Sequence, residues 1–285
     1  MYDNRASHAG SAMTYTIAVC NQKGGVGKTT LTINLGAALA DLGQRVLLVD
    51  LDPQGHLTEG VGLQECYLNS HPTLYDALTS KEPVRLDSLI QRQTKEHEPF
   101  AVIPASYQLM LAEQTLYMTR NREHKLKNLL AQLDNQFDYI LVDCPPVLGN
   151  LTDNALNAAR RVVIPIQAEA TSVRALELLF DQIESVERGL NIQVQVLGVV
   201  PNMVQDSAMA KKILQDLRGS VPVLAPFELR KRVILQAAWA NGCSIFAYQP
   251  PSSADERIKR EVTDLYRDLG RFVMDQAEGG PPNDR

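Results

Sequence analysis

Residues 21–30 read NQKGGVGKTT, and this stretch decides the fold of the 285-residue chain. It directly follows the apolar run TIAVC, residues 16–20, and precedes a helical pattern that we expect to begin near Thr29. A glycine-rich turn between a strand and a helix lets backbone N–H groups and the helix N-terminus face a polyphosphate. The stretch therefore predicts a P-loop.

Different residues of the loop are expected to bind the nucleotide and Mg²⁺. Lys28 is placed to reach the β and γ phosphates, and the Thr29 hydroxyl is placed to reach Mg²⁺. Gln22 stands where the usual pattern has its first glycine, and Lys23 beside it is an additional lysine. A GxGxxG dinucleotide fingerprint is absent. We expect ATP or ADP to be bound by Gly24, Gly25, Val26, Gly27, Lys28, Thr29 and Thr30.

Short apolar runs that alternate with longer helical patterns continue along the chain. Such a rhythm is typical of an α/β protein with a mostly parallel, twisted sheet and helices on both faces. We expect a single P-loop NTPase domain over residues 14–277, with disordered tails at 1–13 and 278–285 and an insertion of loops and short helices at 60–99. The predicted strands are TIAVC (16–20), RVLLVD (45–50), FAVIPA (100–105), DYILVD (138–143), RVVIPI (161–166) and VQVLGVV (194–200).

The composition limits the class of protein. Four cysteines are scattered singly, without ligand spacing, so neither a disulfide framework nor a zinc site is indicated. No apolar run approaches the roughly 18 residues of a membrane span, and we expect a cytoplasmic protein. The net charge of −5 argues against a globally basic nucleic-acid binder, although local basic patches can still contact phosphates.

Two carboxylate motifs follow other predicted strands. Asp50 and Asp52 lie in VDLDPQG, residues 49–55, where the carboxyl ends of parallel strands form a ligand crevice. Asp143 ends the apolar strand in ILVDCPP, residues 140–146, which is the Walker B arrangement that presents a carboxylate to the metal. We take the adjacent Cys144 as a packing residue.

These three motifs, in this order, resemble the ParA/MinD family of deviant Walker A ATPases, and the short ParA (Soj-like) partition ATPases most closely. The resemblance covers residues 15–274. It implies that Lys23 is the signature lysine, which crosses the interface of an ATP-sandwich dimer to the partner's phosphates. It also implies that Asp52 positions the attacking water and that Asp50 supports Mg²⁺ together with Thr29 and Asp143. Lys23, Lys28 and Asp52 are thus the candidate catalytic residues.

At two positions the resemblance leaves the role of a residue open. Asn202, in VVPNM, lies where relatives contact the adenine base, but asparagine is also common in a Pro-Asn turn for backbone reasons. His56 follows DPQG where the family commonly has asparagine, and no role is assigned to it.

Basic residues of the C-terminal third are candidates for non-specific DNA contact, because the resemblance places DNA binding there. Such contacts need no base readout and are sensitive to salt. A third basic group, Arg257, Lys259 and Arg260, lies on a long helix expected at 254–274, whose mixed charges favour docking on the core over a membrane surface. We favour Arg230, Lys231 and Arg232, and also consider Lys211, Lys212 and Arg218.

The expected function is a switch that moves cargo along DNA. ATP and Mg²⁺ would close a homodimer that binds DNA on the nucleoid, and hydrolysis stimulated by a ParB-like or other adaptor would release it. Plasmid or chromosome segregation is the first choice of cargo, and a protein organelle such as the carboxysome is an alternative. Two other classes are a MinD-like membrane-cycling regulator of division-site placement and a metabolic P-loop enzyme that acts on a small molecule.

Overall fold

The computed structural model describes residues 13–69, 72–80, 82–92, 94, 98–221 and 223–279. The two predicted disordered tails lie outside the described residues except for Met13, Glu278 and Gly279.

A six-stranded sheet in the order β3-β2-β4-β1-β5-β6 forms the centre of the molecule, and every neighbouring pair is parallel. All six predicted strands are confirmed, with ends that differ by at most two residues. Buried apolar runs suit a parallel sheet that is covered on both faces. The strands are β1 (Tyr15–Val19), β2 (Val46–Asp50), β3 (Ala101–Ile103), β4 (Tyr139–Asp143), β5 (Arg161–Ile166) and β6 (Gln195–Pro201).

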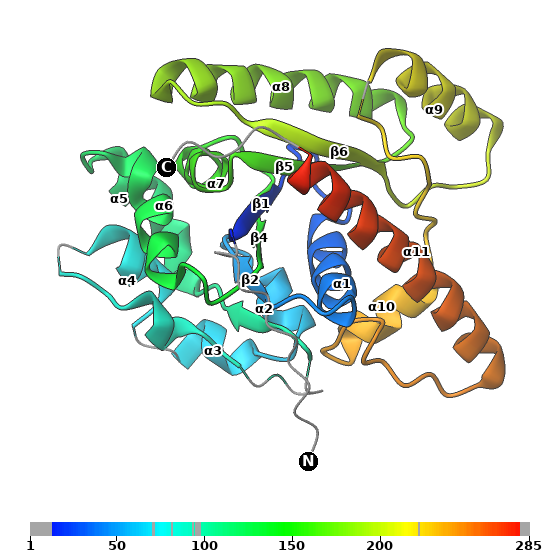
Figure 1. Cartoon of the computed structure of the whole chain (residues 1–285), viewed down its shortest axis with the longest axis horizontal. Coiled ribbons are helices and arrows are strands. Elements are labelled where there is room, and N and C mark those ends of the chain that lie inside the picture. Colours follow the sequence, from blue (N-terminus) through cyan, green and yellow to red (C-terminus); the bar gives the residue numbers. More distant parts are fainter. Residues whose placement is uncertain are drawn as a thin grey trace.

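Helices cover both faces of the sheet (Figure 1). The described residues of the predicted insertion at 60–99 form loops and short helices, as expected. The α-helices are α1 (Lys28–Asp41), α2 (His56–Gly60), α3 (Gln64–Asn69), α4 (Leu74–Thr79), α5 (Ala112–Tyr117), α6 (Lys125–Leu130), α7 (Asn150–Ala159), α8 (Ala170–Leu190), α9 (Ala208–Ser220), α10 (Val233–Ala240) and α11 (Ser253–Glu278). Short 3₁₀ helices are η1 (Leu86–Leu89), η2 (Tyr107–Leu111), η3 (Arg122–His124) and η4 (Ala131–Leu133).

The two faces of the sheet bury separate apolar clusters. Successive side chains of a strand point to opposite faces. In β1, Ala18 therefore joins the cluster under α5, α6, α7 and α8, whereas Ile17 and Val19 join the cluster under α1, α10 and α11. Because both faces are buried, the strands are apolar throughout.

The longest helix, α11, lies beside α1 on one face (Figure 1). The sequence predicted residues 254–274, and the helix extends to Glu278. Its apolar stripe packs on the core, with Val262 and Leu269 buried and Ile258, Leu265 and Phe272 partly buried. The expected docking of this helix on the core is confirmed.

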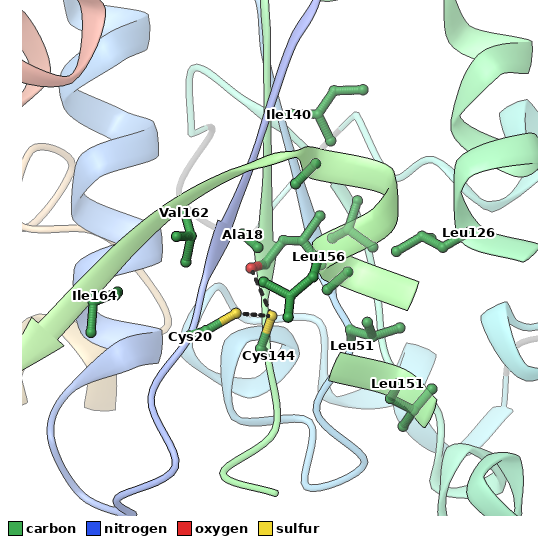
Figure 2. Packing of buried hydrophobic residues seen from close by; sticks show 14 of the residues in the cluster. Ala18, Cys20, Leu51, Leu126, Ile140, Cys144, Leu151, Leu156, Val162 and Ile164 are labelled. Atoms are coloured by element: carbon green, nitrogen blue, oxygen red, sulfur yellow. Dashed lines mark hydrogen bonds between the residues drawn. The ribbon is translucent and has the colours of Figure 1, made fainter. Parts of the chain in front are cut away.

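Cys144 is a packing residue, as expected. It lies in the cluster beside Cys20, with the two Sγ atoms 3.0 Å apart and both side chains 1% exposed (Figure 2). Leu51 and Leu156 of the same cluster surround the pair (Figure 2).

The sheet register brings the predicted motifs to one edge. Val19 pairs with Asp143 across β1 and β4, and Asp50 pairs with Asp143 across β2 and β4. The P-loop starts directly after β1, so the loop and both aspartates meet at the carboxyl edge of the sheet. This is the position at which open α/β sheets bind ligands.

Candidate nucleotide site

Two glycines give the P-loop its shape. Gly25 and Gly27 have φ values of 74° and 82°, a left-handed conformation that side chains disfavour. Gly27 caps α1, and its carbonyl accepts the first helical hydrogen bond, from the Leu31 N–H at 2.9 Å. The helix begins at Lys28, one residue before the predicted start. The N-terminal N–H groups of α1 therefore face the space over the loop, as an anion site requires.

A cavity of about 620 Å³ opens over this loop. Its volume lies within the range of small-molecule and cofactor sites. Of the predicted nucleotide-binding residues, only Val26 does not line it, because this side chain is fully buried in the core. The cavity is lined by Gly24, Gly25, Gly27, Lys28, Thr29, Thr30, Asp52, Gln54, His56, Pro146, Asn202, Met203, Arg230, Lys231, Arg232, Leu235, Gln236 and Trp239.

Thr29 and Asp143 are in contact beneath the loop. The Thr29 hydroxyl donates to Asp143 Oδ2 at 2.7 Å, and the Thr32 hydroxyl donates to Asp143 Oδ1 at 3.2 Å. A hydroxyl with a carboxylate behind it is the donor set that P-loop proteins use for Mg²⁺. Among the described residues there is no group of three His, Cys, Asp or Glu side chains that could hold a metal. Mg²⁺ is usually held by one or two protein ligands together with substrate phosphates and water.

The structure separates Asp50, the last residue of β2, from Asp52, which follows the strand. Asp52 lines the cavity, and its Oδ1 accepts from the Gln54 N–H at 3.0 Å. Asp50 lies beneath the cavity, fully buried, and its Oδ2 accepts from the Thr58 N–H at 2.8 Å and from the Thr58 hydroxyl at 2.6 Å. Asp52 is thus placed to face a ligand, whereas Asp50 fixes the start of α2.

Burial raises the pKa of both Asp50 and Asp143. For Asp50, the neighbouring Asp143 carboxylate raises the pKa further, and the bonds from Thr58 oppose the shift. For Asp143, the bond from Thr29 and the charge of Lys28 oppose the effect of burial. Two buried acidic groups at one edge of the sheet favour the binding of a cation there.

The two lysines of the loop point to different places. Lys28 is 7% exposed and lines the cavity. Lys23 does not line the cavity, and its amine lies 2.5 Å from a Glu169 carboxylate oxygen. Glu169 comes from the segment between β5 and α8, and Gln167 of this segment donates to the Gly25 carbonyl at 3.0 Å. The segment thus holds the P-loop at two points.

Asn202, at the end of β6, lies against the P-loop. Its Nδ2 donates to the Val26 carbonyl at 2.8 Å, and its Oδ1 accepts from the Met203 N–H at 2.9 Å. A Cβ atom on Gly27 would lie 2.6 Å from Nδ2. The residue is therefore both a turn asparagine and part of the cavity wall. Contact with the adenine base stays a prediction.

The basic groups predicted for DNA contact lie in two places. Arg230, Lys231 and Arg232 line the nucleotide cavity, and Arg232 forms an ion pair with Glu261. Lys211, Lys212 and Arg218 are exposed on α9, away from the cavity lining. Two of these form exposed ion pairs, Lys211 with Asp206 at 2.6 Å and Arg218 with Glu228 at 2.8 Å.

Several residues of the site had no role in the sequence analysis. Gln167 and Glu169 follow the β5 strand at the same edge as the P-loop, and this position is the signal that could have found them. Trp239 lines the cavity from α10, and its Nε1 donates to the His56 carbonyl at 3.1 Å. No pattern in the sequence links His56 to Trp239.

None of the described helices is long and apolar enough to cross a membrane.

Comparison with known proteins agrees with this geometry. A family model described as AAA domain matches residues 14–196. The chromosome-partitioning ATPase Soj of Treponema pallidum is 44% identical, with 88% of this chain and 97% of the relative covered. The sporulation initiation inhibitor protein Soj of Bacillus subtilis is 39% identical, with 90% and 97% covered.

Solved structures share the fold. Cobyrinic acid a,c-diamide synthase from Mycobacterium smegmatis, with bound ADP and magnesium, has a TM-score of 0.77 at 32% identity over 94% of this chain and 97% of that one. The Cyanothece McdA(D38A)-ATP complex has a TM-score of 0.78 at 23% identity over 97% and 100%. The P-loop geometry and the coverage of the Soj proteins identify the family. The chain belongs to the ParA/Soj family of P-loop partition ATPases.

Proposed function

We propose that this ATPase binds Mg²⁺ and ATP in the cavity over the P-loop and hydrolyses ATP as the timing step of a DNA-based positioning cycle. Lys28 contacts the β and γ phosphates, Thr29 binds the metal, and Asp143 lies behind Thr29. Mg²⁺ neutralises charge on the transferring phosphoryl group. Asp52, at the cavity wall, positions the attacking water. The bond from Thr29 to Asp143 supports these roles.

The active form is a sandwich dimer in which Lys23 reaches the partner's nucleotide. The observation that carries this proposal is the position of Lys23, which belongs to the P-loop but lies outside the cavity of its own chain. A cation contributes to phosphoryl transfer only where it lies near the developing charge. To act in a partner's site, Lys23 must leave Glu169. That ion pair is exposed, and such pairs contribute about 0–1 kcal/mol.

In the ATP-bound dimer, α9 contacts DNA phosphates through Lys211, Lys212 and Arg218. Exposed ion pairs such as those of Lys211 and Arg218 are weak, so phosphates can displace the acidic partners. Arg230, Lys231 and Arg232 line the nucleotide cavity instead. From there they link nucleotide binding to the basic surface of α9. Binding of this kind carries no sequence preference.

The cycle ends when an adaptor protein of the ParB type stimulates hydrolysis and the dimer leaves the DNA. We assign the chain to plasmid or chromosome segregation in the cytoplasm, on the nucleoid. The reason is that the Soj of Treponema pallidum and the ParA of Myxococcus xanthus are named for chromosome partitioning and match 88% and 94% of this chain. A protein organelle is the alternative cargo, and its positioning would use the same cycle. In a MinD-like membrane cycle a basic helix would lie on the lipid, but α11 has mixed charges and packs on the core.

A second candidate function is amidation of a small carboxylate. The likeness to the Mycobacterium smegmatis synthase favours it. Against it stand the higher identity to the Soj relatives and the presence of Lys23. Hydrolysis of ATP that depends on a small carboxylate and an amide donor would identify this activity.

DNA binding in defined nucleotide states tests the main proposal. We would measure binding of the purified protein to unrelated DNA sequences with ADP, with ATP, and with ATP for Asp52→Ala, at two salt concentrations. Binding is expected with ATP, to be strongest for Asp52→Ala because this dimer cannot hydrolyse ATP, and to weaken with salt. Sedimentation in the same states is expected to show a dimer in both states that contain ATP and no dimer with ADP.

A double substitution and a matched control locate the DNA surface. Lys211→Ala with Lys212→Ala is expected to lower the slope of log affinity against log salt by about 2, one unit for each lost phosphate contact. Arg188→Ala, on the exposed side of α8, should leave it unchanged. Absence of DNA binding in all three states would refute the proposal.

A further inference from the structure

The segment from η2 through α5 exposes an apolar face. Tyr107, Met110, Leu111, Tyr117 and Met118 are 47%, 56%, 53%, 68% and 84% exposed. Their spacing of three, four and seven residues repeats along one side of a helix. The opposite side, with Leu109, Ala112 and Leu116, is buried in the core. The exposed set is therefore one surface, separate from the nucleotide cavity and from α9.

Basic side chains adjoin this apolar face. Residues 107–130, from η2 through α6, contain four lysines and arginines and two glutamates, in a chain whose net charge is −5. The guanidinium of Arg122 lies 5.4 Å from the centre of the Tyr117 ring, and its Nη1 donates to the Tyr117 carbonyl at 3.1 Å. Arg120 follows Met118 closely and is exposed. The apolar and basic groups thus form one continuous surface.

The positive charge of this surface is only partly compensated. Arg122 pairs with Glu123 at 3.2 Å, and the other acidic residue of the segment, Glu113, accepts hydrogen bonds from the N-terminus of α7. Within the described parts of the chain, Arg120, Lys125 and Lys127 have no ion-pair partner. Partial burial, and then the charge of Arg160, lower the pKa of Lys127. On the surface itself, an anionic ligand would pair with the exposed Arg120.

The kind of anion follows from the apolar side chains. Single-stranded nucleic acids bind by stacking bases on exposed aromatic faces. Here Arg122 already covers one face of Tyr117, and the most exposed member is the thioether of Met118. Flexible methionine side chains adapt to apolar side chains of a protein partner. The combination favours an acidic peptide with apolar side chains over a nucleic acid.

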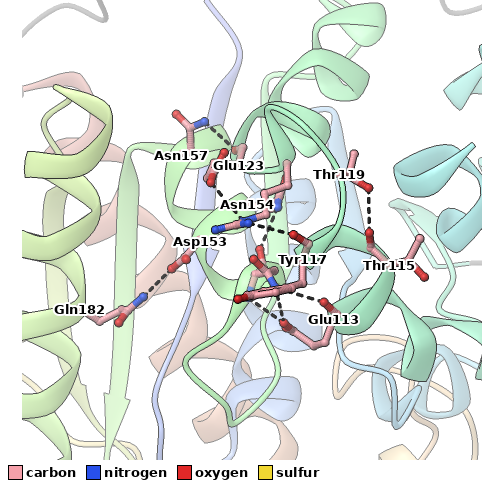
Figure 3. A network of polar contacts seen from close by, with 11 residues as sticks. Glu113, Thr115, Tyr117, Thr119, Glu123, Asp153, Asn154, Asn157 and Gln182 are labelled. Carbon is pink, nitrogen blue, oxygen red and sulfur yellow. Dashed lines mark hydrogen bonds and ion pairs between the residues drawn. The ribbon is translucent and has the colours of Figure 1, made fainter. Parts of the chain in front are cut away.

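Glu113 belongs to a network of polar contacts that connects α5 with α7 (Figure 3). It lies on α5, and its carboxylate accepts from the backbone N–H groups of Asn150 at 2.8 Å and Leu151 at 3.0 Å, at the N-terminus of α7. The preceding residue, Gly149, has no room for a Cβ atom, which would lie 2.8 Å from Glu113 Oε1. The loop 144–149 therefore runs between Asp143 and the cap that α5 supplies, and Pro146 of this loop lines the cavity.

We propose that the surface formed by Met110, Leu111, Tyr117, Met118, Arg120 and Arg122 docks an acidic, amphipathic segment of a partner protein, and that Glu113 carries the effect of docking to the loop 144–149. The docking step is independent of DNA binding. The effect on ATP turnover rests on the proposed function of the nucleotide site.

The docking step is tested with a displayed library of random peptides, about 18 residues or five helical turns long, selected on the protein without nucleotide or DNA. We expect the selected peptides to be acidic and apolar. Their affinity, measured by fluorescence anisotropy, should fall at least about tenfold in Met118→Glu with Arg120→Glu. The control, Met209→Glu with Arg188→Glu, alters a methionine and an arginine of similar exposure on α9 and α8 and should bind as the wild type does.

Three results would overturn the docking proposal. These are no enrichment of peptides, enrichment of basic peptides, or equal binding of the selected peptides to the Met118→Glu, Arg120→Glu protein. A single-stranded oligonucleotide that binds the wild type and loses affinity in the same variant would show a nucleic-acid surface instead. Thermal unfolding of each variant confirms that the fold is intact. The peptide readouts depend neither on ATP hydrolysis nor on DNA.

The connection through Glu113 has its own readout. A selected peptide should raise the rate of ATP hydrolysis by the wild type about fivefold or more, as expected for a coupling of ordinary size. In Glu113→Ala the same peptide should bind with unchanged affinity but lose this effect, because α5 no longer contacts α7 through the carboxylate. Equal stimulation of both proteins would show that Glu113 has no such role.

Discussion

Gly27 shows how one residue determines the shape of the nucleotide site. Its φ of 82° is left-handed, and a Cβ atom would lie 2.6 Å from the Asn202 amide nitrogen. Asn202 cannot turn away without losing its bond to the Val26 carbonyl. We therefore expect Gly27→Ala to lower the free energy of unfolding by about 2–3 kcal/mol, from the backbone conformation and the lost hydrogen bond. Urea denaturation without nucleotide measures the change.

Gly24 provides the matched control for this prediction. It belongs to the same loop, its φ is not positive, and a Cβ atom there meets no atom within 4 Å. Gly24→Ala should change the free energy of unfolding by less than about 0.5 kcal/mol. If the two variants were equally stable, the clash with Asn202 would not constrain the loop.

At the scale of residues, the sequence predicted the parts of the site that belong to one continuous motif. The P-loop and the aspartates after β2 and β4 were found because their spacing from a strand end has a physical meaning. The cavity wall formed by Arg230 and by Trp239 of α10 was not recognised, because both residues reach the cavity by tertiary packing. Lys23 was found, but its contact with Glu169 depends on β1 and β5 being neighbours in the sheet, which the sequence does not show.

At the scale of elements, the end of β4 opposite the nucleotide is held by one ion pair. Arg45, just before β2, contacts both carboxylate oxygens of Asp138, just before β4, at 2.6 and 3.1 Å. The bonds from Arg45 lower the pKa of Asp138. Because the folded-state pKa is below the unfolded value of about 3.9, the pair stabilises the fold above that value. The contribution is lost as the pH falls through the folded pKa.

Arg45→Gln should therefore destabilise the protein in a pH-dependent way. We expect a loss of about 1 kcal/mol at pH 7, a modest value because the Arg45 side chain is 51% exposed. The loss should be constant down to about pH 5 and should shrink below about pH 4. Urea denaturation across this range measures it. Arg188→Gln, whose pair with Glu184 is more exposed, should show no such dependence.

Element types were predictable because both faces of the sheet are buried and the apolar runs are unbroken. The ends of the elements were harder to predict. The last helix extends past the predicted Met274 because Val273 and Ala277 are also buried on the core. The order of the strands could not be predicted from the sequence, because β1 lies between β4 and β5 through contacts between distant segments. The 3₁₀ helices follow no apolar period that could have revealed them.

At the scale of the whole molecule, the nucleotide joins parts that are far apart in the chain. The cavity is bounded by the P-loop, by Asp52 after β2, by Asn202 after β6 and by α10. A ligand that contacts all four must stabilise the native state, because the unfolded chain lacks the cavity. At a free concentration of one hundred times the dissociation constant, the gain is about 2.7 kcal/mol.

Thermal unfolding with Mg²⁺ and ATP tests this linkage. For a chain of this size the gain corresponds to a rise of about 5 °C or more in Tm. Chelation of Mg²⁺ should reduce the rise, because the buried carboxylates at the sheet edge then face the phosphates without a metal. Lys28→Ala should abolish it, since the phosphates lose their buried cation, whereas Arg188→Ala should keep it. A full rise in Lys28→Ala would place the nucleotide outside the P-loop, and the roles given to Thr29, Asp52 and Asp143 would fail with it.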